Sequence, residues 1–146
     1  FFRRLAEGVF DQADLEVRTH ELATFLEQAR EHYALGDVPI VGVGFSNGAN
    51  ILSSLLLRHP GLVRGALLLR AMVPFSPTTL PSLAGTTITL ANGMYDPIVP
   101  REQPEQLATQ LRTAGATVRL EWLPTGHQLT STDMQLGRDL VHAVLA

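Results

Sequence analysis

The stretch VPIVGVGFSNGANILSSLLLRHP, residues 38 to 60, decides the fold. Residues 39 to 45 are apolar without polar alternation, which is typical of a strand buried on both faces in a parallel sheet. Residues 47 to 59 read as a helix, and Pro60-Gly61 ends it. Ser46 therefore lies at a strand-to-helix turn, between Gly44 and Gly48.

The flanking sequence continues the alternation of strands and helices. Apolar periodicity predicts helices over residues 11 to 35, 101 to 114 and 131 to 145, and strands over residues 63 to 69, 87 to 91 and 118 to 123. This order indicates an α/β fold with a mostly parallel sheet flanked by helices. A length of 146 residues fits a single domain, residues 1 to 146.

The composition limits the classes of partner and chemistry. A net charge of -3, with scattered basic residues, favours neither nucleic acid nor an anionic membrane as partner. The absence of cysteine excludes disulfides and thiolate chemistry, and it favours the cytoplasm as location. No apolar run in the sequence has the length of a membrane span.

The pattern Gly44-Phe45-Ser46-Asn47-Gly48 fits G-x-S-x-G, in which a sharp turn presents a serine nucleophile. Glycines at both ends allow the close passage of strand and helix. The first N–H groups of the following helix would face a developing oxyanion.

Two other interpretations of this turn stay open. Gly42, Gly44 and Gly48 loosely match a dinucleotide-binding loop, but the usual acidic residue after the next strand is missing. Arg70 stands there instead; it could contact a 2′-phosphate, although a surface charge at a strand end is the commoner role. A tight turn without chemistry is the other interpretation.

A serine nucleophile needs a base and a group that orients the base. His127 follows the last predicted strand in a loop, whereas the other histidines lie on predicted helices. Asp96 follows the strand over residues 87 to 91, in a loop stiffened by Pro97 and Pro100. We interpret the remaining acidic side chains as helix caps or solvated charges, and these include Glu102, Glu105, Asp133 and Asp139.

Three segments together resemble the α/β-hydrolase superfamily, and more narrowly its phospholipase/carboxylesterase-like branch of small cytosolic esterases. They are G-F-S-N-G at residue 44, G-x-x-D-P-x-V-P at residue 93 and T-G-H-Q-L at residue 125. The resemblance implies Ser46 as nucleophile, Asp96 as orienting acid, His127 as base and the Asn47 backbone N–H as an oxyanion donor. It implies neither a metal ion nor another cofactor.

The resemblance departs from the family at one point. The family carries further strands and an H-G-x-G-type segment before the nucleophile strand, and this segment supplies the second oxyanion donor. We therefore expect a domain that is incomplete at its N-terminus, with half an oxyanion hole. We also expect the strand over residues 38 to 45 to become a sheet edge, which would recruit another strand.

The loops expected around Ser46 are apolar and indicate a short, uncharged ester as substrate, with a thioester next. Candidate substrate-binding side chains are Met72, Phe75, Met94 and Leu129. The alternative is a non-catalytic binding or receptor-like module that kept a hydrolase-like pocket. A homo-oligomer is left open.

Overall fold

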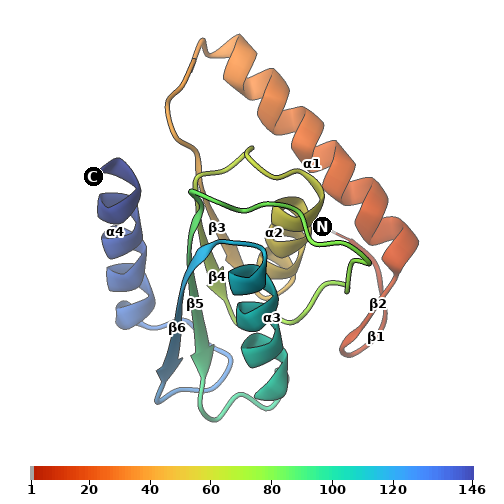
Figure 1. Ribbon diagram of the computed structural model, residues 1–146. Helices are drawn as coiled ribbons and strands as arrows, with labels where there is room; N and C mark the ends of the chain where they lie inside the picture. The colour runs from red at the N-terminus through yellow and green to blue at the C-terminus, as the bar shows by residue number, and fades with distance from the viewer. Residues whose placement is uncertain (1) are drawn as a thin grey trace.

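The computed structural model describes residues 2–146, and Figure 1 gives the labels of its elements. In chain order they are β1 (Arg4–Ala6), β2 (Val9–Phe10), α1 (Gln12–His32), β3 (Val41–Phe45), α2 (Asn47–Arg58), β4 (Gly65–Leu69), β5 (Thr87–Gly93), α3 (Glu102–Thr113), β6 (Thr117–Leu123) and α4 (Ser131–Leu145). The helices and the four longer strands match the predicted ones, with bounds shifted by a few residues.

The four longer strands form one parallel sheet in the order β3-β4-β5-β6. All carboxyl ends of these strands therefore lie at one edge, where an α/β sheet places its functional loops. The predicted fold class, a parallel sheet flanked by helices, is confirmed. The short antiparallel hairpin of β1 and β2 was not predicted, because strands of three and two residues carry no periodic signal.

Helices cover both faces of the sheet (Figure 1). Ala66 and Leu68 of β4 belong to the larger core, together with side chains of α2 and α3, while Leu67 and Leu69 pack with Leu136 and Leu140 of α4. The twofold alternation of a strand sends successive side chains to opposite faces. Because both faces are covered, the apolar β4 is buried along its whole length.

The strand β3 is not buried on both faces, contrary to the prediction. It lies at the end of the strand order, and among residues 2–146 no strand pairs with its other edge. Val43 is 65% exposed and Phe45 is 39% exposed. The apolar run predicted the strand correctly, and the expectation that it becomes a sheet edge is confirmed for residues 2–146.

Candidate active site

Ser46 lies between β3 and α2 in a strained backbone conformation, with φ 53° and ψ -114°. Its N–H donates to the Leu69 carbonyl oxygen at 2.8 Å, which ties the turn to the end of β4. A Cβ atom at Gly44 would overlap the Gly48 carbonyl and lie 2.7 Å from the Ala49 Cα. Glycine is therefore required at position 44, as the G-x-S-x-G pattern predicts.

His127 links Ser46 to Asp96 through its two ring nitrogens. Its Nε2 lies 3.0 Å from Ser46 Oγ, and its Nδ1 lies 2.8 Å from Asp96 Oδ2. The Asp96 side chain is 1% exposed and that of His127 is 21% exposed. Three residues from three separate loops thus form one hydrogen-bonded chain, in the order that a general base and its orienting acid require.

The Asp96 carboxylate is held by its own loop as well as by His127. Its Oδ1 accepts the backbone N–H groups of Ile98 at 2.8 Å and Val99 at 3.1 Å. The other oxygen, Oδ2, therefore stays directed at the imidazole. This hydrogen-bonded turn explains why an Asp, followed by Pro97, stands at this position.

The loops of Asp96 and His127 are joined by their backbones. Met94 N–H donates to the Leu123 carbonyl at 2.8 Å, and Tyr95 N–H donates to the Thr125 carbonyl at 3.0 Å. Gly93 lies so close to this second loop that a Cβ atom would overlap the Gly126 carbonyl oxygen. Asp96 and His127 thus lie on two loops whose backbones are hydrogen-bonded to each other.

Asn47 is the first residue of α2, so its backbone N–H belongs to the positive end of that helix, next to Ser46. Its side-chain Nδ2 donates to the Phe2 carbonyl at 3.4 Å. The N-terminal hairpin segment therefore contacts the residue that follows the serine.

The structure separates the four side chains that the sequence indicated as a substrate pocket. Met94 and Leu129 are 51% and 45% exposed, on the loops that carry Asp96 and His127. Met72 is half-buried against an apolar cluster of the hairpin and helices: Phe2, Phe10, Leu15 and Ile51.

Phe75 does not lie with the others. Its ring packs against the guanidinium of Arg58, whose central carbon lies 4.1 Å from the ring centre. Arg58 is the last residue of α2, whereas Ser46 lies just before the first residue of that helix. Gln110 Nε2 of α3 donates a hydrogen bond to the Phe75 carbonyl oxygen at 3.2 Å. The loop from residue 70 to 86 has left the serine end of α2 at this point, so the assignment of Phe75 to the substrate pocket is corrected.

Arg70 and Asp133 form a buried ion pair that the sequence interpretation missed. Both side chains are fully buried, and Arg70 Nη1 and Nη2 donate to Asp133 Oδ1 and Oδ2 at 2.9 and 2.8 Å. Arg70 is therefore not a surface charge, and its guanidinium is already committed to a carboxylate, which removes the contact expected of a dinucleotide 2′-phosphate. The sequence signal was weak, because charge alone does not reveal burial.

Asp133 also caps α4. Its carboxylate accepts the Thr130 backbone N–H at 2.7 Å, while Thr130 Oγ1 accepts the Asp133 N–H, and the two bonds form a capping box. Burial opposes ionisation of Asp133, but the hydrogen bonds from Arg70 and Thr130 outweigh it, so the pKa of this carboxyl is lowered from 3.8. The interpretation of Asp133 as a cap is confirmed, and the interpretation as a solvated charge is wrong.

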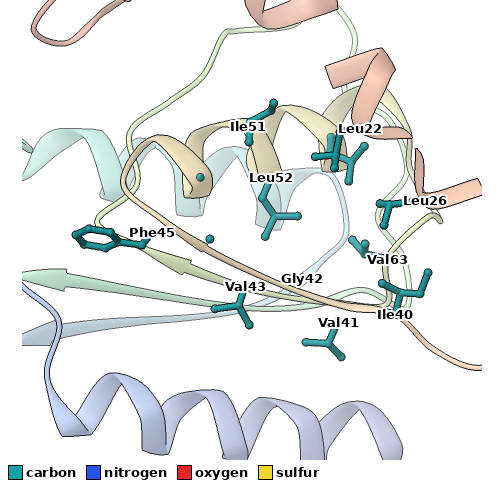
Figure 2. A pocket seen from close by; sticks show the side chains of 13 residues that line it. Leu22, Leu26, Ile40, Val41, Gly42, Val43, Phe45, Ile51, Leu52 and Val63 are labelled. Atoms are coloured by element: carbon teal, nitrogen blue, oxygen red, sulfur yellow. The ribbon is translucent and has the colours of Figure 1, made fainter. Parts of the chain in front are cut away.

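An apolar cavity of about 390 Å³ runs along β3 (Figure 2). Leu22 and Leu26 of α1 and Leu52 of α2 line it together with the backbone of β3, as Figure 2 shows. Ser46, Asp96 and His127 do not line it. We therefore treat this cavity as part of the exposed side of β3 and not as the substrate site.

Residues 2–146 contain neither a candidate metal site nor a membrane-spanning helix. No group of three His, Cys, Asp or Glu side chains in this range could hold a metal ion. No helix in the same range is both long enough and apolar enough to cross a membrane.

Comparisons with known proteins show the family to which the chain belongs. The family model of phospholipases and carboxylesterases matches residues 7–144. A curated protein of Bacillus subtilis (strain 168), named "Putative hydrolase MhqD", is 42% identical over 139 residues, which is 95% of this chain and 70% of that protein.

Two solved structures share the fold closely. The carboxylesterase of Bacillus cereus is 41% identical with a TM-score of 0.93, over 99% of this chain and 68% of that one. The carboxylesterase of Mesorhizobium loti is 32% identical with a TM-score of 0.90, over 97% of this chain and 67% of that one. The chain belongs to the phospholipase/carboxylesterase family of α/β-hydrolases.

Proposed function

We propose that this protein is a serine esterase that cleaves small, uncharged carboxylic esters through an acyl-enzyme. The observation that carries the proposal is the hydrogen-bonded chain from Asp96 through His127 to Ser46, with distances of 2.8 and 3.0 Å. The name of the Bacillus cereus relative, a carboxylesterase, supports the same reaction class.

In the acylation step, Ser46 Oγ attacks the ester carbonyl carbon while His127 Nε2 takes the hydroxyl proton. Asp96 accepts a hydrogen bond from His127 Nδ1 and stabilises the imidazolium that forms. The carbonyl oxygen becomes an oxyanion, to which the Asn47 N–H donates at the start of α2. The bond to the leaving oxygen then breaks, and the imidazolium returns the proton to release an alcohol.

In the deacylation step, water takes the place of the alcohol. His127 removes a proton from the water as its oxygen attacks the acyl carbon, and a second tetrahedral oxyanion forms. This intermediate expels Ser46 Oγ, which takes the proton back from His127. The products are a carboxylic acid and the free enzyme.

The surroundings of the three residues favour an uncharged substrate. Met94, Ile98 and Leu129 are exposed on the loops of Asp96 and His127 and offer an apolar rim. Arg70 is buried and bound to Asp133, so its charge is neutralised within the fold. The apolar rim therefore suits an ester with a short, uncharged acyl or aryl group, and the charge of Arg70 is not available to bind a charged substrate.

We further propose that residues 1 to 146 belong to a single α/β-hydrolase domain and that the protein acts in the cytoplasm. The chain has no cysteine, which suits a reducing compartment. Among residues 2–146 no strand pairs with the outer edge of β3, and this supports a homo-oligomer formed through that edge.

The test uses protein expressed from its complete reading frame, with p-nitrophenyl acetate and butyrate as substrates. Ser46→Ala should lower kcat by roughly 10³-fold or more, because the nucleophile and its base act as a unit. Ser76→Ala, which changes an exposed serine in the loop after β4, is the matched control and should keep the wild-type rate.

A fluorophosphonate probe separates the esterase from the receptor-like alternative. The esterase should be labelled at Ser46 and should turn over at least one simple ester. Labelling at Ser46 without turnover of any ester would favour the receptor-like module. Turnover that survives Ser46→Ala would contradict the assigned nucleophile.

A further inference from the structure

Arg70 is a buried arginine in a backbone conformation that arginine rarely adopts. It follows β4 directly, its φ is 57°, and its side chain is fully buried. Burial of a charge and a positive φ both cost free energy, and such features persist where the surrounding structure holds them in place. This combination points to a role beyond filling space in the core.

The guanidinium of Arg70 connects three parts of the chain that are distant in sequence. Besides Asp133, Nη1 donates to the Ala91 carbonyl of β5 at 3.0 Å, and Nη2 donates to the Gln128 carbonyl at 2.7 Å. Gln128 directly follows His127. The contacts at Gln128 and Asp133 hold both ends of the short segment that joins the base to α4.

The backbone next to Arg70 connects to the nucleophile. The Leu69 carbonyl accepts the Ser46 N–H at 2.8 Å, and the Arg70 N–H donates to the Ala91 carbonyl at 2.9 Å. A single dipeptide at the end of β4 therefore contacts the serine turn through its backbone and the histidine loop through its side chain. The relative position of Ser46 and His127 is set across this link.

We propose that Arg70, held by Asp133, is a positioning residue that keeps His127 at hydrogen-bonding distance from Ser46. The proposal rests on the function proposed above. Arg70 does not touch the reacting atoms; it acts through the backbone of the histidine loop. Arginine suits this task better than lysine, because its planar fork can serve a carboxylate and carbonyl groups at once.

The test must separate positioning from stability, because removal of one partner alone would leave an unpaired buried charge. The double variant Arg70→Met/Asp133→Leu replaces the pair by apolar side chains, an exchange that is often neutral for folding. Because Asp133 also caps α4, we expect a somewhat lower melting temperature, and kcat is compared under conditions where the circular dichroism matches that of the wild type. Its kcat should fall about 10- to 100-fold, because small displacements of a catalytic group are that costly, with KM close to the wild-type value.

Two single variants complete the set in case the double variant does not fold. Arg70→Lys keeps the charge but not the fork, and Asp133→Asn keeps the shape but not the charge. Each should lose kcat with little change in KM under conditions where its circular dichroism matches that of the wild type. If every folded variant keeps the wild-type kcat, the proposal is overturned.

The matched control is Thr19→Val. Thr19 Oγ1 contacts Ser54 Oγ at 2.8 Å in the interface of α1 and α2, away from the histidine loop. This variant should lower the melting temperature and leave kcat unchanged. A loss of kcat in the Arg70 and Asp133 variants that is no larger than in Thr19→Val would show a general effect of stability and would overturn positioning.

A spectroscopic signal tests the position of His127 without reference to turnover. The proton on His127 Nδ1, bonded to Asp96, should give a downfield ¹H resonance that disappears in His127→Gln. We expect this resonance to shift or broaden in the double variant and to stay in place in Thr19→Val; an unchanged resonance in the folded double variant would overturn the proposal. If the wild type hydrolyses no ester, the proposed function fails separately, and the resonance alone decides on positioning.

Discussion

At the scale of single residues, the candidate site concentrates strained backbone conformations at the ends of two adjacent strands. Ser46 after β3 and Arg70 after β4 have φ angles of 53° and 57°. Such conformations cost about 1–3 kcal/mol each for residues other than glycine, and they cluster at functional sites. Backbone hydrogen bonds at both positions, to Leu69 and Ala91, help to hold them.

The change Asp96→Asn tests the acid at this scale. The amide presents N–H groups where the carboxylate has only acceptors, so it cannot serve the Ile98 and Val99 N–H groups and His127 together. Stopped or steady-state esterase assays should show a fall in kcat of about 10³- to 10⁴-fold, the size found for this change in serine proteases. If a folded Asp96→Asn variant keeps the wild-type kcat, a group other than Asp96 must orient His127.

The change Gly93→Ala tests how closely the loops of Asp96 and His127 are packed. The added methyl group would overlap the carbonyl oxygens of Gly126 and Thr125 and push the loop of His127 away. We expect a loss of about 1–3 kcal/mol in the free energy of unfolding and a fall in kcat of about 10²-fold. Urea unfolding and initial rates measure the two effects.

The control for Gly93→Ala is Gly137→Ala in α4. There the added methyl group would lie 3.3 Å from Leu67 Cδ2, a side chain that can shift, and alanine favours the helix. This variant should keep the wild-type kcat. Equal rates for Gly93→Ala and Gly137→Ala would contradict the close loop packing.

At the scale of secondary-structure elements, a histidine pair joins α1 to the end of α2. His20 Nδ1 and His59 Nε2 lie 2.8 Å apart, so one ring donates and the other accepts. Glu16 and Arg58 lie beside the pair, and Glu27 acts on it from α1. Burial of His59, and then the charge of His20, lower the pKa of His59 from 6.5.

This lowered pKa predicts the direction of a pH effect on stability. The unfolded chain takes up a proton at His59 near its ordinary pKa of 6.5, and the folded chain does so only at lower pH. The contribution of neutral His59 to the free energy of unfolding is therefore complete above pH 6.5, and it decreases as the pH falls below this value. Thermal melts should show a lower melting temperature at pH 5.5 than at pH 7.5.

The variant His59→Gln should make the melting temperature less dependent on pH in this range. His142→Gln changes an exposed histidine of α4 and should leave the dependence as in the wild type. If both variants show the wild-type dependence, the histidine pair does not cause it.

At the scale of the whole molecule, helices cover both faces of the sheet, and β3 and β6 are its two edge strands among residues 2–146. β4 and β5 are each paired on both sides, whereas β3 presents its outer edge without a partner among residues 2–146. The cavity of about 390 Å³ lies along the same strand (Figure 2). An exposed apolar edge is a template for pairing with another chain.

We expect residues 1–146, expressed alone, to associate in a concentration-dependent way through β3. Val43→Lys places a charge on this strand at a position that is 65% exposed, and it should shift sedimentation toward the monomer. Val17→Lys adds the same charge to the exposed face of α1 and should not. A wild-type chain that stays monomeric at all concentrations would contradict the prediction.

Much of the fold, and the contact of Ser46 and Asp96 with His127, could be predicted from the sequence because the signals lie in short segments. Apolar periodicity places each longer strand and helix, and the residue types around Ser46 specify its turn. Asp96 and His127 follow from chemistry: each stands in a loop after a strand, and parallel strands bring such loops to one edge.

The sequence by itself determined the order of the elements, the parallel sheet and the identity of the serine turn. The tertiary structure alone decided that Arg70 pairs with Asp133, that Phe75 turns to Arg58 and that the side chains of Val43 and Phe45 in β3 are exposed. The reason is physical: periodicity and turn chemistry act between neighbours in the chain, whereas burial and ion pairing depend on residues far apart in sequence. Arg70 and Asp133 meet only because β4 and α4 pack together, and no local pattern contains that contact.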